Sequence, residues 1–187
     1  SPDGGLMRVQ AGAIDGKVLV EYYDNSYNIQ RTVTVPLALP LFGAFYESGS
    51  NYYILTGQNN DSQDDNKEVY RVTKYSKDWK AQGSCSLFGA NTAQPFAFGT
   101  ARMMVSGNYL YVRTCHVMYN GHQANVTFSV NTSDMSIMDQ YYKVEYTPSG
   151  YVSHTFTQFL KMDNGTFLGV DQGDTYPRGI NLVKSTI

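Results

Sequence analysis

The sequence predicts an all-β fold: a partial β-propeller of about three to four four-stranded antiparallel blades. The chain has 16 Tyr, 9 Phe and 17 Gly among 187 residues and only 16% charged residues, a composition that favours half-buried strands joined by turns. A turn glycine followed by a strand recurs at Gly49, Gly107 and Gly165, so the period is 58 residues in both steps. A repeat of about this size, built from short strands, is typical of a propeller, whose blades bury their faces by stacking on one another. No segment of ten or more residues has apolar side chains at helical spacing.

The spacing divides the chain into two complete blades and two partial ones. We expect a partial blade over residues 5–36, blades over 41–88 and 100–145, and a partial blade over 153–187. Each partial blade holds three strands. Three explanations remain open for the two incomplete ends: further blades in a larger protein, which we favour, pairing of the two ends, or association with another copy of the chain.

Small polar residues mark the turn before each expected outer strand. The turns are Asp24-Asn25-Ser26-Tyr27, Ser76-Lys77-Asp78-Trp79 and Thr132-Ser133-Asp134-Met135. Polar side chains at these positions can hydrogen-bond their own backbone and reverse the chain. The large apolar residue that closes each turn can then pack beneath the outer strand.

Charge and cysteine content exclude several classes of partner. The formal net charge is −2, which provides no field to attract nucleic acid, so we expect no nucleic-acid partner. No apolar run is long enough to insert into a membrane. The start of the chain, with no initiator methionine or signal peptide, indicates a processed or excised piece. Cys85 and Cys115 lack the spacing of a zinc or redox site, and we expect free thiols packed in the core.

Several strings of residues resemble an uncharacterised group of propeller-like domains. They are Arg113-Thr114-Cys115-His116-Val117-Met118-Tyr119, Gly121-His122-Gln123-Ala124-Asn125-Val126-Thr127, Val152-Ser153-His154-Thr155-Phe156-Thr157-Gln158-Phe159 and Gly173-Asp174-Thr175-Tyr176-Pro177-Arg178. The group belongs to large exported or cell-surface proteins of Gram-positive, often gut-dwelling, bacteria. The resemblance implies a secreted or cell-surface location and a propeller fold. It implies no activity.

The repeat places one set of candidate ligand-binding residues at a single rim. Gln58, His116 and Asp174 each follow a repeat glycine by nine residues, and loops at equivalent positions of successive blades open on the same face. The candidates are Gln58, Arg113, His116, Tyr119, His122, His154, Asp174, Tyr176 and Arg178. These histidines and arginines can bind an anionic or hydroxyl-rich ligand, or they can tie long loops together by hydrogen bonds.

No catalytic, cofactor or metal motif is present in the sequence. There is no serine nucleophile elbow and no phosphate-binding glycine loop, and His116 and His122 are too far apart in sequence for a compact metal motif. We therefore expect a non-enzymatic binding or scaffold module that recognises a glycan or a protein. An enzyme of propeller type, such as a lyase, hydrolase or group-transfer enzyme using the His/Arg residues, is the alternative. A structural, self-assembling fragment is a third hypothesis.

Overall fold

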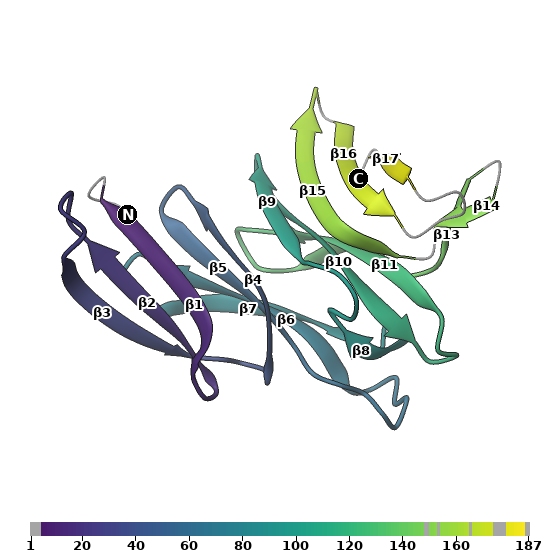
Figure 1. Ribbon diagram of the computed structural model, residues 1–187. Helices are drawn as coiled ribbons and strands as arrows, with labels where there is room; N and C mark the ends of the chain where they lie inside the picture. The colour runs from purple at the N-terminus through teal and green to yellow at the C-terminus, as the bar shows by residue number, and fades with distance from the viewer. Residues whose placement is uncertain (1–4, 148–149, 153, 165, 174–178, 186–187) are drawn as a thin grey trace.

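The computed structural model of the chain consists of antiparallel β-sheets that follow one another in chain order (Figure 1). It describes residues 5–147, 150–152, 154–164, 166–173 and 179–185, and these contain no helix. Within this described part there is consequently no helix that could cross a membrane. The strands are β1 (Leu6–Ile14), β2 (Lys17–Tyr23), β3 (Ile29–Pro36), β4 (Leu41–Ser48), β5 (Asn51–Gly57), β6 (Glu68–Ser76), β7 (Ala81–Phe88), β8 (Thr92–Pro95), β9 (Arg102–Ser106), β10 (Tyr109–Met118), β11 (Gln123–Asn131), β12 (Ile137–Tyr141), β13 (Glu145–Thr147), β14 (Gly150–Val152), β15 (Thr155–Asp163), β16 (Thr166–Gly173) and β17 (Gly179–Ser185).

The strands form four main sheets. The first sheet has the order β1-β2-β3, the second β4-β5-β6-β7 and the last β15-β16-β17. In the third sheet β12, β11 and β10 are followed by β9 and β8, which both pair with β10 at different heights. The short hairpin β13-β14 links the third sheet to the last.

The sheets stack like the blades of a propeller. The inner strand β4 lies beside β9, and β9 lies beside β15, so successive sheets meet along their inner strands. Figure 1 shows the sheets side by side in chain order, with β1 as the strand of the first sheet nearest to the second. Because each sheet covers a face of its neighbour, the predicted all-β partial propeller is confirmed.

The three polar turns share one backbone conformation. Tyr27, Trp79 and Met135 have φ of 63°, 61° and 60°, the left-handed region that non-glycine residues adopt only when local bonds hold them there. Trp79 N–H donates to the Ser76 carbonyl at 3.0 Å and Met135 N–H to the Asn131 carbonyl at 2.8 Å. Two of these turn residues face the preceding sheet: Trp79 packs with residues of the first sheet, and Met135 lies against Gly83 of the second, whereas Tyr27 is exposed.

The repeat slips by one residue in the last sheet. The strand pairs that flank the tight turns are Ser48–Asn51 and Ser106–Tyr109, but Asp163–Thr166 in the last sheet. Asn164, with φ of 47°, therefore takes the place that Gly49 and Gly107 hold. A slip of one residue reverses which face every following side chain occupies, so equivalent positions are 57 residues apart between the third and last sheets.

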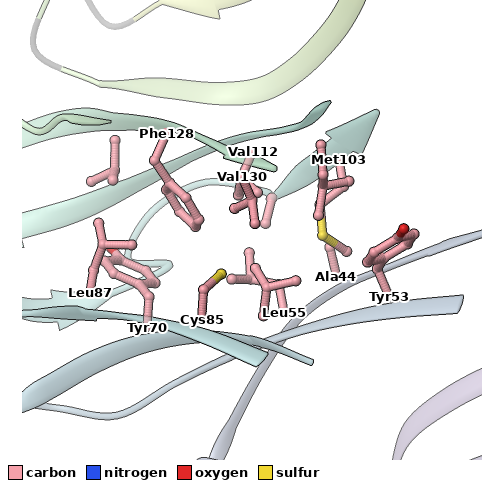
Figure 2. Packing of buried hydrophobic residues seen from close by; sticks show 14 of the residues in the cluster. Ala44, Tyr53, Leu55, Tyr70, Cys85, Leu87, Met103, Val112, Phe128 and Val130 are labelled. Atoms are coloured by element: carbon pink, nitrogen blue, oxygen red, sulfur yellow. The ribbon is translucent and has the colours of Figure 1, made fainter. Parts of the chain in front are cut away.

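Two apolar clusters hold the first three sheets together. One lies between the first and second sheets and includes Val18, Val20 and Ile54. The larger one joins the second and third sheets, with Leu55 and Tyr70 facing Val112, Phe128 and Val130 (Figure 2). The two clusters make these two interfaces between sheets apolar.

Cys85 and Cys115 are both free and buried, as the sequence predicted. Burial in this apolar interior raises the pKa of each thiol to about 12. Both side chains are therefore uncharged packing groups.

Candidate functional site

Two of the loops predicted to share a rim do lie together. The β5–β6 loop reaches the β10–β11 loop, where Gln63 Nε2 donates to the Tyr119 carbonyl at 2.8 Å. Asn60 Nδ2 donates to the Tyr119 hydroxyl at 3.1 Å, and that hydroxyl donates to Asp65 Oδ1 at 3.1 Å. Tyr119 thus hydrogen-bonds a loop of the third sheet to a loop of the second.

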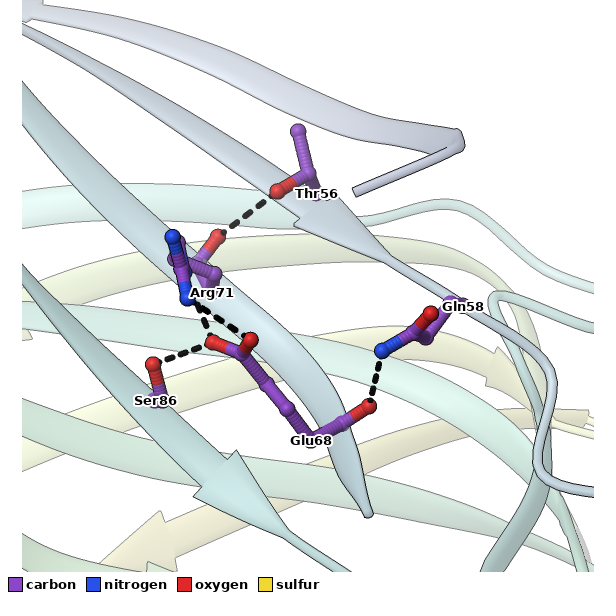
Figure 3. Close-up of polar contacts among 5 residues, drawn as sticks. All are labelled: Thr56, Gln58, Glu68, Arg71 and Ser86. Carbon is purple, nitrogen blue, oxygen red and sulfur yellow. Dashed lines mark hydrogen bonds and ion pairs between the residues drawn. The ribbon is translucent and has the colours of Figure 1, made fainter. Parts of the chain in front are cut away.

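Gln58 also ties a loop to its sheet. Its Nε2 donates to the Glu68 carbonyl at 2.8 Å. The Glu68 carboxylate accepts two bonds from Arg71, from Nε and Nη2 at 2.7 Å each, and a third from the Ser86 hydroxyl. Figure 3 shows this network at the start of β6. The polar groups of Gln58 and Glu68 thus hold the loop against the second sheet.

His116 lies in the interior rather than at an open rim. It is fully buried, and its Nδ1 lies 2.7 Å from the Thr92 hydroxyl. Burial lowers the pKa of His116 to about 4, because the charged imidazolium is poorly solvated there. The ring is neutral at physiological pH, and it joins β10 to β8.

The other two histidines pack against aromatic rings. His122 lies 5.5 Å from the ring centre of Tyr151 on β14, and His154 lies 6.0 Å from that of Phe98. His154 is buried. These contacts help to hold the link between the third and last sheets in place.

Arg113 faces the opposite side of β10 from His116. The two residues are three positions apart on one strand, and side chains of a strand alternate between its faces. Their nearness in sequence led to the prediction that they share a site, but the pleat of the strand places them on opposite faces. His116 contacts β8, and Arg113 faces the last sheet.

Arg113 is held at the floor of a cavity between the third and last sheets. It is only 1% exposed and binds Glu145 of β13 through two bonds, Nη1 to Oε1 at 2.9 Å and Nη2 to Oε2 at 3.1 Å. Thr127 and Asn125 complete the network, at 2.8 Å from Arg113 Nη1 and 3.2 Å from Glu145 Oε2 respectively. A buried guanidinium needs this full set of partners, so the floor is rigid and polar.

The cavity has a volume of about 620 Å³, which is in the range of small-molecule sites. Its walls combine aromatic rings with polar groups. Tyr141 and Tyr146 are exposed at its edge, and Phe167 is buried beneath them. Burial and the neighbouring Glu145 carboxylate raise the pKa of Tyr141, and its hydroxyl donates to the Val144 carbonyl at 3.1 Å. The remaining charged and amide groups of the lining are Asp139, Gln140, Asn181 and Lys184.

The sequence analysis missed most of this cavity. Glu145 and Tyr146 follow the expected outer strand of the third blade and were assigned no role. One signal was available: an arginine inside a strand of otherwise apolar and small polar residues requires a carboxylate from elsewhere in the chain. The sequence could not say which carboxylate supplies it.

Three predicted site residues, Asp174, Tyr176 and Arg178, lie outside the described residues. The predicted equivalence of Asp174 with Gln58 and His116 is wrong, because the slip in the last sheet gives that place to Gly173. As ligand contacts, all the predicted residues remain predictions. In the part of the chain that the structure describes, no group of three His, Cys, Asp or Glu residues is placed to hold a metal ion.

Comparison with known proteins identifies no family for the chain. No family model and no curated protein matches the sequence. Among solved structures, the chain is similar to a GH43 protein from Bacillus licheniformis, with a TM-score of 0.37 and 10% identity over 78% of this chain and 40% of that one. It is also similar to a xylan β-1,4-xylosidase from Bacillus halodurans, with a TM-score of 0.34 and 11% identity over 79% of this chain and 41% of that one. The chain thus spans about two fifths of the length of each.

Proposed function

We propose that the chain is an extracellular binding module that holds a glycan in the cavity between the third and last sheets. The observation that carries this proposal is the combination, in one cavity of about 620 Å³, of exposed tyrosine rings with a fixed Arg113–Glu145 pair. A sugar ring offers C–H groups on its faces and hydroxyls around its rim. Flat aromatic rings suit the faces, and immobile polar groups suit the hydroxyls.

The polar floor also favours binding over catalysis. Hydrolysis of a glycosidic bond uses a pair of carboxyl groups, one of which must carry a proton to give to the leaving oxygen. Glu145 is bound twice by the Arg113 guanidinium and once by Asn125, so both of its oxygens are held by protein donors. Asp139, the other carboxylate of the lining, is exposed. One carboxyl group of the lining is therefore occupied by protein donors, and the other is exposed.

The surface location follows from the resemblance to exported proteins of Gram-positive gut bacteria. We place the module outside the cell, attached to a larger protein, where it engages a glycan of the surroundings. A protein ligand is the main competing partner, because exposed tyrosines also serve protein interfaces.

The test is a glycan array followed by titration calorimetry with the best soluble glycan. Tyr146→Ala removes a ring that is 80% exposed, so we expect at least a tenfold loss of affinity with no change in unfolding temperature. Tyr27→Ala is the matched control, since Tyr27 is 76% exposed on the first sheet, on the opposite side of the structure, and its loss should leave affinity unchanged.

Three outcomes would contradict the proposal. If no glycan binds at millimolar concentration, the cavity is not a glycan site, and binding of a protein instead would establish the competing partner. If Tyr146→Ala and Tyr27→Ala weaken binding equally, the ligand sits elsewhere. Release of a reducing sugar from a bound glycan would identify an enzyme.

A further inference from the structure

Among the residues that the structure describes, the first sheet has no inner strand. The polar turn that ends in Tyr27 joins β2 to β3, and the matching turns join β6 to β7 and β11 to β12. Strands β1, β2 and β3 therefore correspond to the second, third and fourth strands of the second sheet. Pairing supports this: Val18–Val35 and Val20–Val33 repeat Tyr70–Leu87 and Val72–Cys85 at the same distances before the turn.

The inner edge of β1 has no strand partner among the described residues. There β1 pairs only with β2, and no backbone hydrogen bond joins this edge to another described element. Every strand that corresponds to β1 does carry an inner neighbour: β5 has β4, β10 has β9 and β16 has β15. An open edge presents a row of backbone donors and acceptors to any chain that can pair with it.

A groove runs along this edge where the inner strand would lie. It has a volume of about 620 Å³ and is lined by Met7 and Val9 of β1, by residues 42–46 of β4, and by Ala101 with the first two residues of β9, Arg102 and Met103. Phe42, Phe45 and Met103 make much of its wall apolar. The groove therefore offers two things side by side: unpaired main-chain groups and apolar surface.

We propose that this groove binds an extended peptide strand, which adds to the edge of β1 and completes the first sheet. Main-chain pairing would give the affinity, and alternate side chains would give the specificity, as in other cases of strand addition. A compact ligand would cover the apolar wall but leave the row of backbone groups unpaired. An extended peptide satisfies both.

The second sheet indicates which side chains fit. Leu55 and Tyr53 of β5 hold the places of Val9 and Met7, and they pair with Ala44 and Tyr46 of β4. The bound strand should therefore carry a small residue opposite Val9 and an aromatic one opposite Met7. The sequence of residues 41–48, Leu-Phe-Gly-Ala-Phe-Tyr-Glu-Ser, is the natural probe because it already fills this role in the second sheet.

The experiment uses the full chain and a fluorescein-labelled peptide of residues 41–48, followed by fluorescence anisotropy. In a set of peptides methylated at one backbone nitrogen each, every second position should lose binding by at least tenfold, because alternate N–H groups of a strand point toward its partner. The other positions should bind as the parent does. A peptide that fails to bind at millimolar concentration, or a methyl effect that does not alternate, overturns the proposal.

Two further measurements locate the site on the protein. Amide exchange along β1 should be fast at its outward positions in the free chain and should slow when the peptide is added; outward amides that are already protected would contradict the open edge. Met7→Lys faces the groove and should weaken the peptide at least tenfold, whereas Leu6→Lys, on the other face of β1, should not. If Met7→Lys does not fold, the methylated peptides still decide the question, and dimers that disappear on adding peptide would mean that a second copy fills the edge.

Discussion

The first and last sheets differ in what their outer faces carry: the first has an ion pair there, and the last has apolar side chains. In the first sheet Val18, Val20 and Val35 are buried against the second sheet, while the outer face carries the Arg8–Glu21 ion pair. In the last sheet Phe167 is the large buried side chain, with its ring centre 5.9 Å from that of Tyr111. Its outer face instead is apolar. Phe159 and Val170 lie directly opposite each other on neighbouring strands and are both exposed.

The two interfaces differ in the same way. The first sheet meets the second through a dry cluster that includes a stack of Trp79 on Tyr52, with ring centres 4.5 Å apart. The last sheet meets the third across the cavity floored by Arg113 and Glu145. Apolar burial is the main stabilising term in folding, so the first sheet is held by the interface itself. The position of the last sheet depends more on polar contacts and on whatever occupies the cavity.

The largest contrast should appear when the same charge is placed on the two sheets. Val20→Asp buries a carboxylate in the fully enclosed cluster between the first and second sheets, which we expect to cost about 4 kcal/mol or more and to unfold the first sheet. Val170→Asp places the same group on the exposed face of the last sheet and should change the free energy of unfolding by less than about 0.5 kcal/mol. Urea titration of both variants measures the difference, and equal losses would mean that the outer face of the last sheet is not open.

Much of the fold could be predicted from the sequence because its signals are local. Turn glycines, polar turn residues and alternating apolar residues gave the inner strands, the outer strands and the three-stranded ends. The slip in the last sheet was missed because Asn164 replaces glycine as the left-handed residue of the turn, and a glycine stands next to it in the sequence. Strand β8 was also missed, since its pairing with β10 follows three left-handed residues, Gly89, Ala90 and Asn91, which a propensity argument does not anticipate.

The candidate site was less predictable because it depends on which face a side chain occupies. The loops around Tyr119 were placed correctly, since loop position follows from strand order. His116 and Arg113 were grouped by their nearness in sequence, although the pleat sends them to opposite faces of β10. The partner of Arg113 comes from β13, a strand that short-range patterns did not reveal.

Lowering the pH should destabilise the folded chain through the buried His116 of the third sheet. His116 has a pKa of about 4 in the folded chain, against about 6.5 when unfolded. Above pH 6.5 the ring is neutral in both states. As the pH falls from 6.5 toward 4, only the unfolded chain gains the proton, so stability falls by about 3 kcal/mol.

Urea titrations between pH 7 and pH 4 check this expectation. The His116→Gln variant is the matched control, because a neutral amide takes the place of the ring and does not titrate. Its stability should fall less over the same range. A parallel decline in both proteins would assign the acid sensitivity to other groups.

The smallest of the three effects should come from the polar turns, where an aromatic residue with the same backbone conformation is packed in one turn and exposed in another. Trp79 packs on Tyr52 of its own sheet and donates from Nε1 to the Tyr22 hydroxyl of the first sheet at 2.8 Å, so Trp79→Ala should cost about 2 kcal/mol through the loss of both contacts. Tyr27 has the same left-handed backbone, with φ of 63° against 61°, but its ring is exposed, so Tyr27→Ala should change stability by less than about 0.5 kcal/mol. Since the backbone strain is matched, the difference in urea midpoint between the variants measures what the Trp79 ring contributes to the cluster between the first and second sheets. A loss for Tyr27→Ala as large as that for Trp79→Ala would mean that the outer face of the first sheet is also covered, and the contrast between the two ends of the stack would then disappear.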